Sequence, residues 1–375
     1  MGDADNRPFR FYDNRQKYLT FVTTCDEKWR VAERAARELR NLQPEPPALR
    51  FFDAGIGDGT VLAHLLRAMH QEYPTIPFYV AGKEISLEDI RLTLEKLPDR
   101  LVEHPQLVAV LTNLNYSEAP TLWPSTRAKQ NQLVFKYVEL EGSSSHTFGE
   151  QLRDMNGFLS EHWQVKVSQK SGNLLYVTPT VLVVYRADQR FALDNMVPRA
   201  GDRKSDFDLI LASQPWRSRM AAQFKVERIL GPLCRSLRSH GVLLGIQSMG
   251  GDPGVEIIRE IWEDENPFPV DRHELLEALH DDLGELGRNF DLMALPLDES
   301  RLQYSMHTLP NEIDASIGTS TLFAAWNAAI YVAQIEDQRV EAAAHDGSYL
   351  DATARILQKH GGLWFNDETF VVRRH

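Results

Sequence analysis

The chain has 375 residues, 43% of them hydrophobic, and a formal net charge of −12 at pH 7. A chain of this length can bury one large core, and we expect one catalytic domain with insertions. The negative charge gives no overall attraction to nucleic acid or to anionic lipid. The expected partner is therefore a small molecule or a peptide or protein substrate, and nucleic acid is not favoured.

Cysteine content and hydropathy indicate the cellular compartment in which the protein is expected. Cys25 and Cys234 lie far apart and lack metal-ligand spacing, which predicts reduced thiols and no metal site. Residues 1–6 are polar and have none of the apolar character of a secretory signal, and the most apolar run, 174–185, is too short to cross a bilayer. We expect a cytoplasmic protein without membrane segments. The sequence leaves its oligomeric state open.

The first segment predicts a helical arm over residues 1–48. Apolar residues recur at helical spacing between residues 15 and 41, and a linker containing Pro44, Pro46 and Pro47 follows. The polar stretch 23–28 interrupts this pattern. It either closes over a ligand or forms a solvated helix face. The catalytic domain is expected to occupy residues 49–375.

The next segment, 49–66, reads as a strand, a glycine loop and a helix. Its loop, residues 53–60, has the sequence DAGIGDGT, with Gly55, Gly57 and Gly59 at alternate positions. Glycine allows positive φ and a close approach of the backbone to a ligand, and the free amides of the helix N-terminus point at its polar groups. The segment therefore predicts a site for a nucleotide-like ligand.

The spacing of this loop argues against a dinucleotide. A dinucleotide loop spaces its glycines G-x-G-x-x-G, and Asp53 and Asp58 would repel a pyrophosphate. Carboxylates instead suit a cationic ligand that carries an ammonium or a sulfonium. A second strand, 77–82, leads to Glu84, and an acid at that position accepts hydrogen bonds from both ribose hydroxyls.

These two features together resemble the class I S-adenosylmethionine-dependent methyltransferases, in which an acid precedes G-x-G-x-G and a second acid closes strand two. The resemblance implies S-adenosyl-L-methionine as the cofactor. It implies that Asp53, Gly55, Ile56, Gly57, Gly59 and Glu84 bind the cofactor. Because ligands of parallel sheets bind at the carboxyl ends of the strands, we also expect Ile85, after strand two, against the adenine face and Asn113, after strand three, on the adenine amine.

The remaining elements predict an α/β fold. Strands at 49–54, 77–82 and 106–112 alternate with helices, and the alternation resumes with strands at 206–212 and 241–246 around a helix at 218–238. Strands at 302–309 and 369–373 complete a Rossmann-like, seven-stranded, doubly wound sheet, whose last strand the resemblance makes antiparallel. Insertions at 120–205, β-rich with a hairpin turn at 170–173, and at 265–345 are expected to form the substrate side.

The fourth strand ends in Ser213-Gln214-Pro215-Trp216. This stretch resembles the (D/N/S)-P-P-(Y/F/W) motif that amino-group methyltransferases place beside the sulfonium, which implies a catalytic role for all four residues. Gln214 stands where the motif has its first proline. The alternative interpretation is a polar turn with a tryptophan packed in the core.

The sequence thus favours an enzyme that transfers a methyl group, preferably to the nitrogen of a small-molecule or peptide acceptor held near residues 213–216. Three alternatives remain open. They are an aminopropyltransferase that uses decarboxylated S-adenosylmethionine, a nicotinamide enzyme, and a scaffold that binds the cofactor without chemistry.

Overall fold

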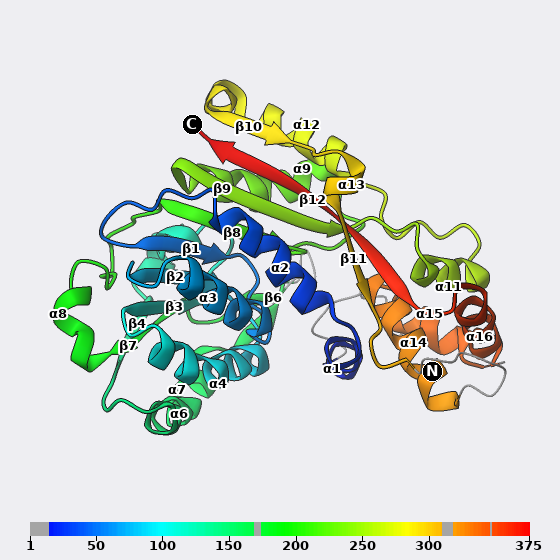
Figure 1. Ribbon diagram of the computed structural model, residues 1–375, viewed down its shortest axis with the longest axis horizontal. Coiled ribbons are helices and arrows are strands. Elements are labelled where there is room, and N and C mark those ends of the chain that lie inside the picture. The colour runs from blue at the N-terminus through cyan, green and yellow to red at the C-terminus, as the bar shows by residue number, and fades with distance from the viewer. Residues whose placement is uncertain (1–14, 169–173, 310–317, 346) are drawn as a thin grey trace.

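The structure is a computed structural model that describes residues 15–168, 174–309, 318–345 and 347–375. Its central sheet has ten strands among the described residues (Figure 1). They are β1 (Leu49–Asp53), β2 (Phe78–Lys83), β3 (Leu107–Thr112), β4 (Val134–Leu140), β7 (Thr180–Arg186), β8 (Phe207–Ser213), β9 (Leu237–Ser248), β10 (Phe290–Met293), β11 (Arg301–Ser305) and β12 (Trp364–Arg374).

The strand order confirms the predicted Rossmann-like sheet. Seven strands follow the order β3-β2-β1-β8-β9-β12-β10, in which β1, β2, β3, β8 and β9 are parallel and β12 runs antiparallel to β9. The predicted antiparallel last strand is therefore correct. Strands β7 and β4 extend the sheet beyond β3, so much of the β-rich insertion joins the central sheet.

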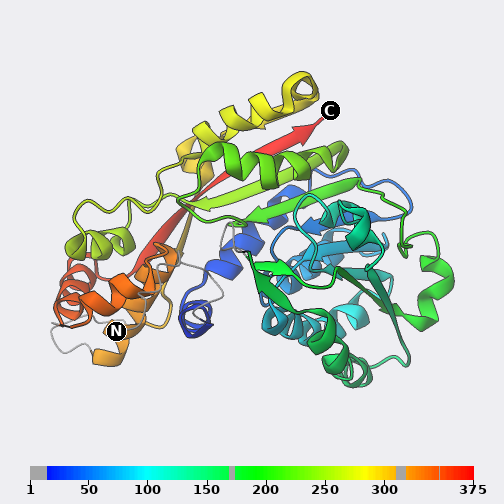
Figure 2. The ribbon, with the colours of Figure 1, turned by 180° about the vertical axis from the view of Figure 1, so that it is seen from behind.

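Both faces of the sheet are covered by helices, which explains why the central strands are continuous hydrophobic runs. In β1, Phe51 packs into one core and its neighbour Phe52 into the other. The first face carries α2 (Glu27–Leu39), α3 (Thr60–Glu72), α4 (Leu87–Glu103), α6 (Ser145–Arg153) and α7 (Asn156–His162). The second face, seen from the front in Figure 2, carries α9 (Ala222–Lys225), η3 (Val226–Leu230), α10 (Gly231–Arg235) and α12 (Arg272–Leu283).

A helical lobe lies to one side of the sheet, as Figures 1 and 2 both show. Its core joins α1 (Arg15–Thr24), α11 (Pro253–Ile261), α14 (Thr319–Val332) and α16 (Ser348–His360), and α15 (Asp337–Ala343) lies beside it. The near ends of β11 and β12 contribute Tyr304 and Phe365 to the same core. Strand β12 therefore runs from the lobe into the central sheet.

Residues 1–14 of the predicted arm lie outside the described residues, and the rest of the arm forms two helices that belong to different parts of the molecule. Helix α2 packs on the central sheet, whereas α1 packs in the lobe. The break between them lies beside β11, where Cys25 forms a β-bridge to Met306 and the Asp26 carboxylate accepts a hydrogen bond from the Ser305 backbone at 2.6 Å. Both helices of the arm are thus fixed to the rest of the fold.

Three element predictions need correction. The helix predicted at 218–238 is one helical segment, 222–235, with a π turn in its middle. The sixth strand, predicted at 302–309, is the shorter β11 (Arg301–Ser305), and the sequence did not predict β10, which also pairs with the long β12. The predicted hairpin exists as β5 (Val165–Val167) antiparallel to β6 (Leu174–Tyr176), but Thr178 and Pro179 end it before β7; its turn lies outside the described residues.

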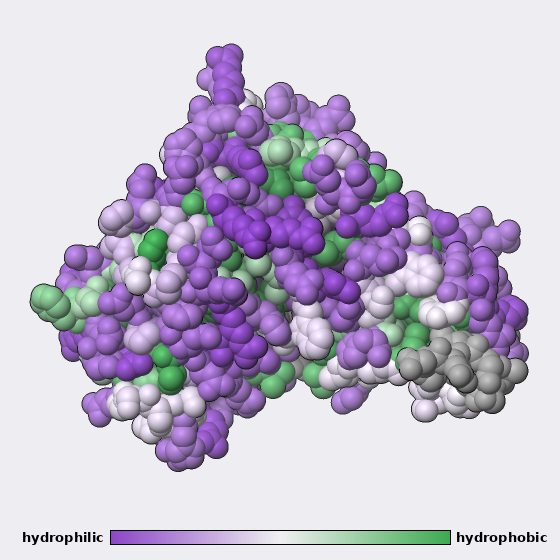
Figure 3. Space-filling view, in the orientation of Figure 1, coloured by the Kyte–Doolittle hydropathy of each residue, from purple (hydrophilic) through white to green (hydrophobic). Residues whose placement is uncertain are grey.

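The connections contain short helices that add little to the core: α5 (Arg127–Gln130), α8 (Arg190–Leu193), α13 (Leu297–Ser300), η1 (Ala119–Thr121), η2 (Ala187–Gln189) and η4 (Gly284–Asn289). The face in Figure 3 is mostly hydrophilic, with a hydrophobic protrusion over α8, where Phe191 is 99% exposed. In the part of the chain that the structure describes, no helix is both long and apolar enough to cross a membrane.

Candidate functional site

A cavity of about 780 Å³ opens at the carboxyl ends of β1, β2 and β8, where ligands of open parallel sheets bind. Its walls come from the central sheet, from both helices of the arm and from α14 of the lobe. Nine of the twelve residues predicted from the sequence line it: Asp53, Gly55, Gly57, Glu84, Ile85, Ser213, Gln214, Pro215 and Trp216.

The glycine bend owes its shape to Gly57 and Gly59, whose φ angles are +58° and +79°. A Cβ on Gly59 would lie 2.8 Å from the Thr93 backbone, whereas one on Gly55 would meet no atom within 4 Å. Ile56 is buried, with its side chain against Gly82. The prediction that Ile56 and Gly59 touch the cofactor therefore needs correction: they do not line the cavity, and they shape the bend from behind.

Gly59→Ala is expected to destabilise the fold by about 2 to 4 kcal/mol, from the left-handed backbone and the clash with Thr93. Gly55→Ala is the matched control: it is expected to unfold like the wild type but to place a methyl group in the cavity and weaken nucleoside binding. Chemical denaturation measures the first effect and calorimetry the second. Equal stability of the two variants would contradict the geometry of the bend.

The Glu84 carboxylate forms hydrogen bonds both to the glycine bend and to the segment that leads into α4. One carboxylate oxygen accepts the Gly57 amide at 2.8 Å, and the other accepts the amides of Ile85 and Ser86 at 2.7 and 2.8 Å. Burial, reinforced by Asp89, raises the pKa of Glu84 to about 7, against the lowering effects of Lys83 and the backbone amides. Burial likewise raises the pKa of Asp53 to about 6, although the Gly55 amide donates to its carboxylate at 3.0 Å.

Asp58 has a different role from the one that the sequence indicated. Its carboxylate accepts hydrogen bonds from the backbone and hydroxyl of Thr60, at 3.2 and 2.6 Å, and Lys96 lies 3.4 Å away. It therefore satisfies the first backbone amide of α3, that of Thr60. Because Asp58 does not line the cavity and is paired with Lys96, its repulsion of a pyrophosphate is weaker than the sequence argument assumed.

Asn113 is also placed differently. Both polar atoms of its side chain form hydrogen bonds with the backbone. Nδ2 donates to the carbonyls of His162 and Thr178, and Oδ1 accepts a hydrogen bond from the Thr180 backbone N–H at 2.9 Å. It is 1% exposed and does not line the cavity. The predicted contact with adenine is not supported; the residues after β3 that do line the cavity are Asn115, Tyr116 and Ser117.

The loop after β8 differs in backbone conformation from the proline motif that it resembles. Gln214 has a φ of +48°, and its backbone N–H donates to the Ile246 carbonyl at 2.9 Å. Proline has a φ near −65° and no N–H, so it cannot occupy this position. Trp216 is 4% exposed and its indole donates to Gln247 at 3.3 Å, which makes it largely a core residue. The four residues line the cavity, but the loop is not a Pro-Pro loop.

Charged and aromatic residues outside the predicted set complete the cavity. Glu27 and Lys28 come from the polar stretch that interrupts the arm, which is the one signal in the sequence that pointed to them. Phe21, Tyr304 and Tyr331 come from the arm and the lobe, and no sequence pattern places them near the glycine bend. The Lys28 Nζ lies 3.9 Å from the position that a Cβ on Gly57 would take.

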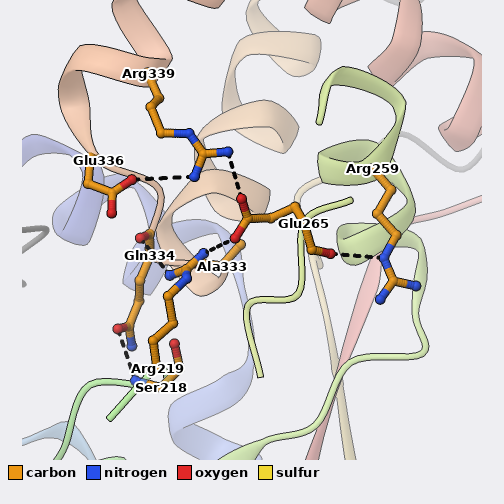
Figure 4. A network of polar contacts seen from close by, with 8 residues as sticks. All are labelled: Ser218, Arg219, Arg259, Glu265, Ala333, Gln334, Glu336 and Arg339. Carbon is orange, nitrogen blue, oxygen red and sulfur yellow. Dashed lines mark hydrogen bonds and ion pairs between the residues drawn. The ribbon is translucent and has the colours of Figure 1, made fainter. Parts of the chain in front are cut away.

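An ion-pair network fixes the loop after β8 to the lobe (Figure 4). Glu265 binds Arg219 and Arg339 with its two carboxylate oxygens, both at 2.6 Å. Arg219 also donates to the carbonyls of Ala333 and Gln334, at 2.9 and 3.0 Å, where α14 ends. Because the loop and the end of α14 both line the cavity, this network holds two of its walls together.

The strand order, the antiparallel β12 and the glycine bend after β1 define a Rossmann-like α/β protein with the fold of the class I methyltransferases. No protein-family model and no curated protein matches the chain. Among solved structures it is similar to the [4+2]-cyclase SpnF, with 12% identity over 99% of this chain and 88% of that one and a TM-score of 0.35.

Two methyltransferase structures are similar to the same degree. A geranyl diphosphate methyltransferase in complex with S-adenosylmethionine is 11% identical over 93% of this chain and 91% of that one, with a TM-score of 0.34. A putative sarcosine dimethylglycine methyltransferase from Galdieria sulphuraria is 10% identical over 92% and 84%, with a TM-score of 0.36. The TM-scores and sequence identities are low, so the fold assignment rests on the strand order and the bend.

Proposed function

We propose that the protein binds S-adenosyl-L-methionine in the 780 Å³ cavity and transfers its methyl group to a nitrogen of a small-molecule or peptide acceptor. The observation that carries the proposal is the position of Glu84. It lines the cavity directly after β2, and its carboxylate accepts a hydrogen bond from the Gly57 backbone N–H at 2.8 Å. A carboxylate thus lies directly beside the left-handed glycine bend, where it is suited to accept hydrogen bonds from ribose hydroxyls. A cavity of this volume suits a small acceptor or a threaded side chain.

The residues present fit this cofactor. Glu84 accepts the ribose hydroxyls, Ile85 offers an apolar surface to the adenine, and Asp53 gives the anionic environment that a sulfonium requires. When bound, S-adenosylmethionine supplies a methyl group whose bonding pair stays on sulfur as the acceptor lone pair attacks carbon. The protein's contribution is to hold the acceptor in line and exclude water, which accounts for about 7 to 11 kcal/mol of a barrier in favourable cases.

Lys28 distinguishes methyl transfer from aminopropyl transfer. Burial would lower the pKa of this ammonium, but Tyr18, Glu27, Asp58 and Asp89 raise it above its ordinary value, so Lys28 is a cation beside the bend. A cation there is suited to the carboxylate of the methionine end. Decarboxylated S-adenosylmethionine, the substrate of an aminopropyltransferase, lacks that carboxylate.

Lys28→Met is therefore expected to weaken binding of S-adenosylhomocysteine roughly tenfold or more, through the loss of one charge-assisted contact. Binding of 5′-methylthioadenosine, which has no amino-acid end, should stay unchanged. Calorimetric titration of both ligands measures the difference. Equal weakening of both would show that Lys28 supports the bend instead of binding the carboxylate.

The test of the function itself has two parts. Calorimetry with S-adenosylhomocysteine and with NAD tests the cofactor, and binding of NAD alone would refute the proposal. Incubation with S-adenosylmethionine and a cell extract, followed by mass spectrometry, tests for S-adenosylhomocysteine and for an acceptor heavier by one methyl group. In a parallel incubation with decarboxylated S-adenosylmethionine, a product heavier by an aminopropyl group would establish the rival transferase.

A cofactor-binding scaffold is a second candidate, and the loop after β8 favours it. The positive φ of Gln214 and the burial of Trp216 remove the proline-rich amine site that the sequence suggested. Tight binding of S-adenosylmethionine without turnover on any fraction of the extract would support this candidate.

A further inference from the structure

The cavity contains a carboxylate that has only long contacts to polar neighbours. Glu27, at the start of α2, lines the cavity, and its side chain is 10% exposed. Its nearest polar neighbours among the described residues are the Gln214 amide, 3.5 Å from Oε1, and the Lys28 ammonium, 3.8 Å from Oε2. Both distances are at the outer limit of a hydrogen bond. Since a buried carboxylate needs a partner, this one is suited to a ligand.

A second acid, Asp367, lies on the other side of the Gln214 side chain from Glu27. Asp367, in β12, is fully buried, and its Oδ2 accepts the Gln214 Nε2 at 3.0 Å. Gln214 thus links the two acids through one amide group. Burial, followed by the charge of Glu27, holds the pKa of Asp367 well above its ordinary value, which favours its neutral form. Burial raises the pKa of Glu27 as well, but the neighbouring Lys28 ammonium lowers it, so Glu27 is the acid of the pair that has a cation beside it at the cavity wall.

The surroundings of Glu27 also suit a cation. Phe21 and Tyr331 lie with ring centroids 4.8 Å apart, and Tyr304 lies edge-on to Phe21 at 6.1 Å. All three rings line the cavity, and aromatic faces attract ammonium groups. The Tyr304 hydroxyl is buried and has no hydrogen-bond partner among the described residues. A polar ligand atom would satisfy it.

The backbone strain at Gln214 points to the same place. A bulky residue with φ of +48° is uncommon, and such strain persists where surrounding contacts over-determine it, which occurs most often at functional sites. Here the strained conformation places the side-chain amide of Gln214 between the carboxylates of Glu27 and Asp367. The loop at the end of β8, where the acceptor is expected, thus positions an acid and not a proline pair.

We propose that Glu27 binds the acceptor's amino group as an ammonium and accepts its proton, with Gln214 and Asp367 as positioning residues. The proposal rests on the proposed function, and it defines the acceptor as a primary or secondary alkyl amine. A nitrogen–hydrogen bond of the ammonium breaks, and the proton moves to a Glu27 oxygen and then to water. The lone pair left on nitrogen forms the new bond to the methyl carbon, whose former bonding pair stays on sulfur.

Sinefungin tests this without knowledge of the acceptor. It carries an amine where S-adenosylmethionine has its methyl sulfonium, S-adenosylhomocysteine carries neither, and both have the same amino-acid end. The wild type is expected to bind sinefungin about tenfold or more tighter than S-adenosylhomocysteine, because one charge-assisted contact is added. Glu27→Gln should abolish that preference and leave the affinity for S-adenosylhomocysteine unchanged.

Each outcome is decisive. No preference for sinefungin in the wild type overturns the proposal without any variant. Equal weakening of both ligands by Glu27→Gln overturns it too, because it would assign Glu27 to the amino-acid end. Failure of the wild type to bind either ligand refutes the proposed function instead. Glu33→Gln, an exposed position on the same helix, is the matched control and should keep the preference.

Asp367→Asn provides a second variant in case Glu27→Gln does not fold. Its side-chain oxygen can still accept the Gln214 amide, so binding of S-adenosylhomocysteine should persist. The preference for sinefungin should fall by less than in Glu27→Gln, because Asp367 acts through Gln214. A loss of affinity for S-adenosylhomocysteine alone would overturn its positioning role.

Discussion

Glu84→Ala is expected to weaken binding of S-adenosylhomocysteine by about 2 to 4 kcal/mol, which is roughly 30- to 1,000-fold. The loss has two physical sources. The ribose hydroxyls lose a charged acceptor, and the Gly57 amide loses the oxygen that fixes the bend at 2.8 Å. Isothermal titration calorimetry of the wild type and the variant measures the effect, and an unchanged affinity would remove Glu84 from the site.

The pH dependence of binding is a control for the role of the charge. With a pKa of about 7, Glu84 becomes protonated as the pH falls through neutrality, and its neutral form is a poorer acceptor. Affinity should therefore fall by up to about tenfold per pH unit below 7 in the wild type. Glu84→Gln should show a flatter profile. Comparing the two proteins cancels the contribution of Asp53, whose pKa is about 6.

Gln214→Pro is expected to destabilise the protein by about 3 kcal/mol or more, although it would restore the residue found in the proline motif. The ring would force φ from +48° to a negative value, and the hydrogen bond to the Ile246 carbonyl would be lost. Denaturant unfolding measures the change. The substitution tests directly whether the loop after β8 has the backbone described here.

Gln214→Asn is the matched control, because asparagine tolerates a left-handed backbone. Its stability should stay within about 1 kcal/mol of the wild type, while its shorter side chain loses reach to the two acids. Wild-type stability of Gln214→Pro would contradict the left-handed conformation at this position.

The sequence predicted the parts of the site that depend on neighbours along the chain. The alternation of strands and helices fixes where β1 and β2 end, and the glycine spacing fixes the bend that Glu84 holds. Asp53, Gly57 and Glu84 therefore come together at one edge of the sheet as expected. Strand β10 was missed because it has only four residues and is recognisable only by its pairing with β12.

The rest of the site depends on contacts that local patterns do not contain. Asn113 follows β3 as expected, but its side-chain amide forms hydrogen bonds with the backbone of Thr178 and Thr180, more than sixty residues away in the sequence. The backbone of Gln214 turns left-handed, which its sequence neighbours do not indicate. Glu27 and Lys28 reach the bend only because α1 and α2 are fixed to the lobe and the sheet.

Strand β12 has a mechanical consequence for access to the cavity. Its residues 364–368 pair with β11 at the lobe, and residues 367–373 pair with β9 in the sheet, within one uninterrupted element. A hinge between the two bodies would have to break this ladder, so they form a rigid frame. Entry then depends on side-chain and loop movement at the rim, and the width of the opening limits how bulky a molecule the cavity accommodates.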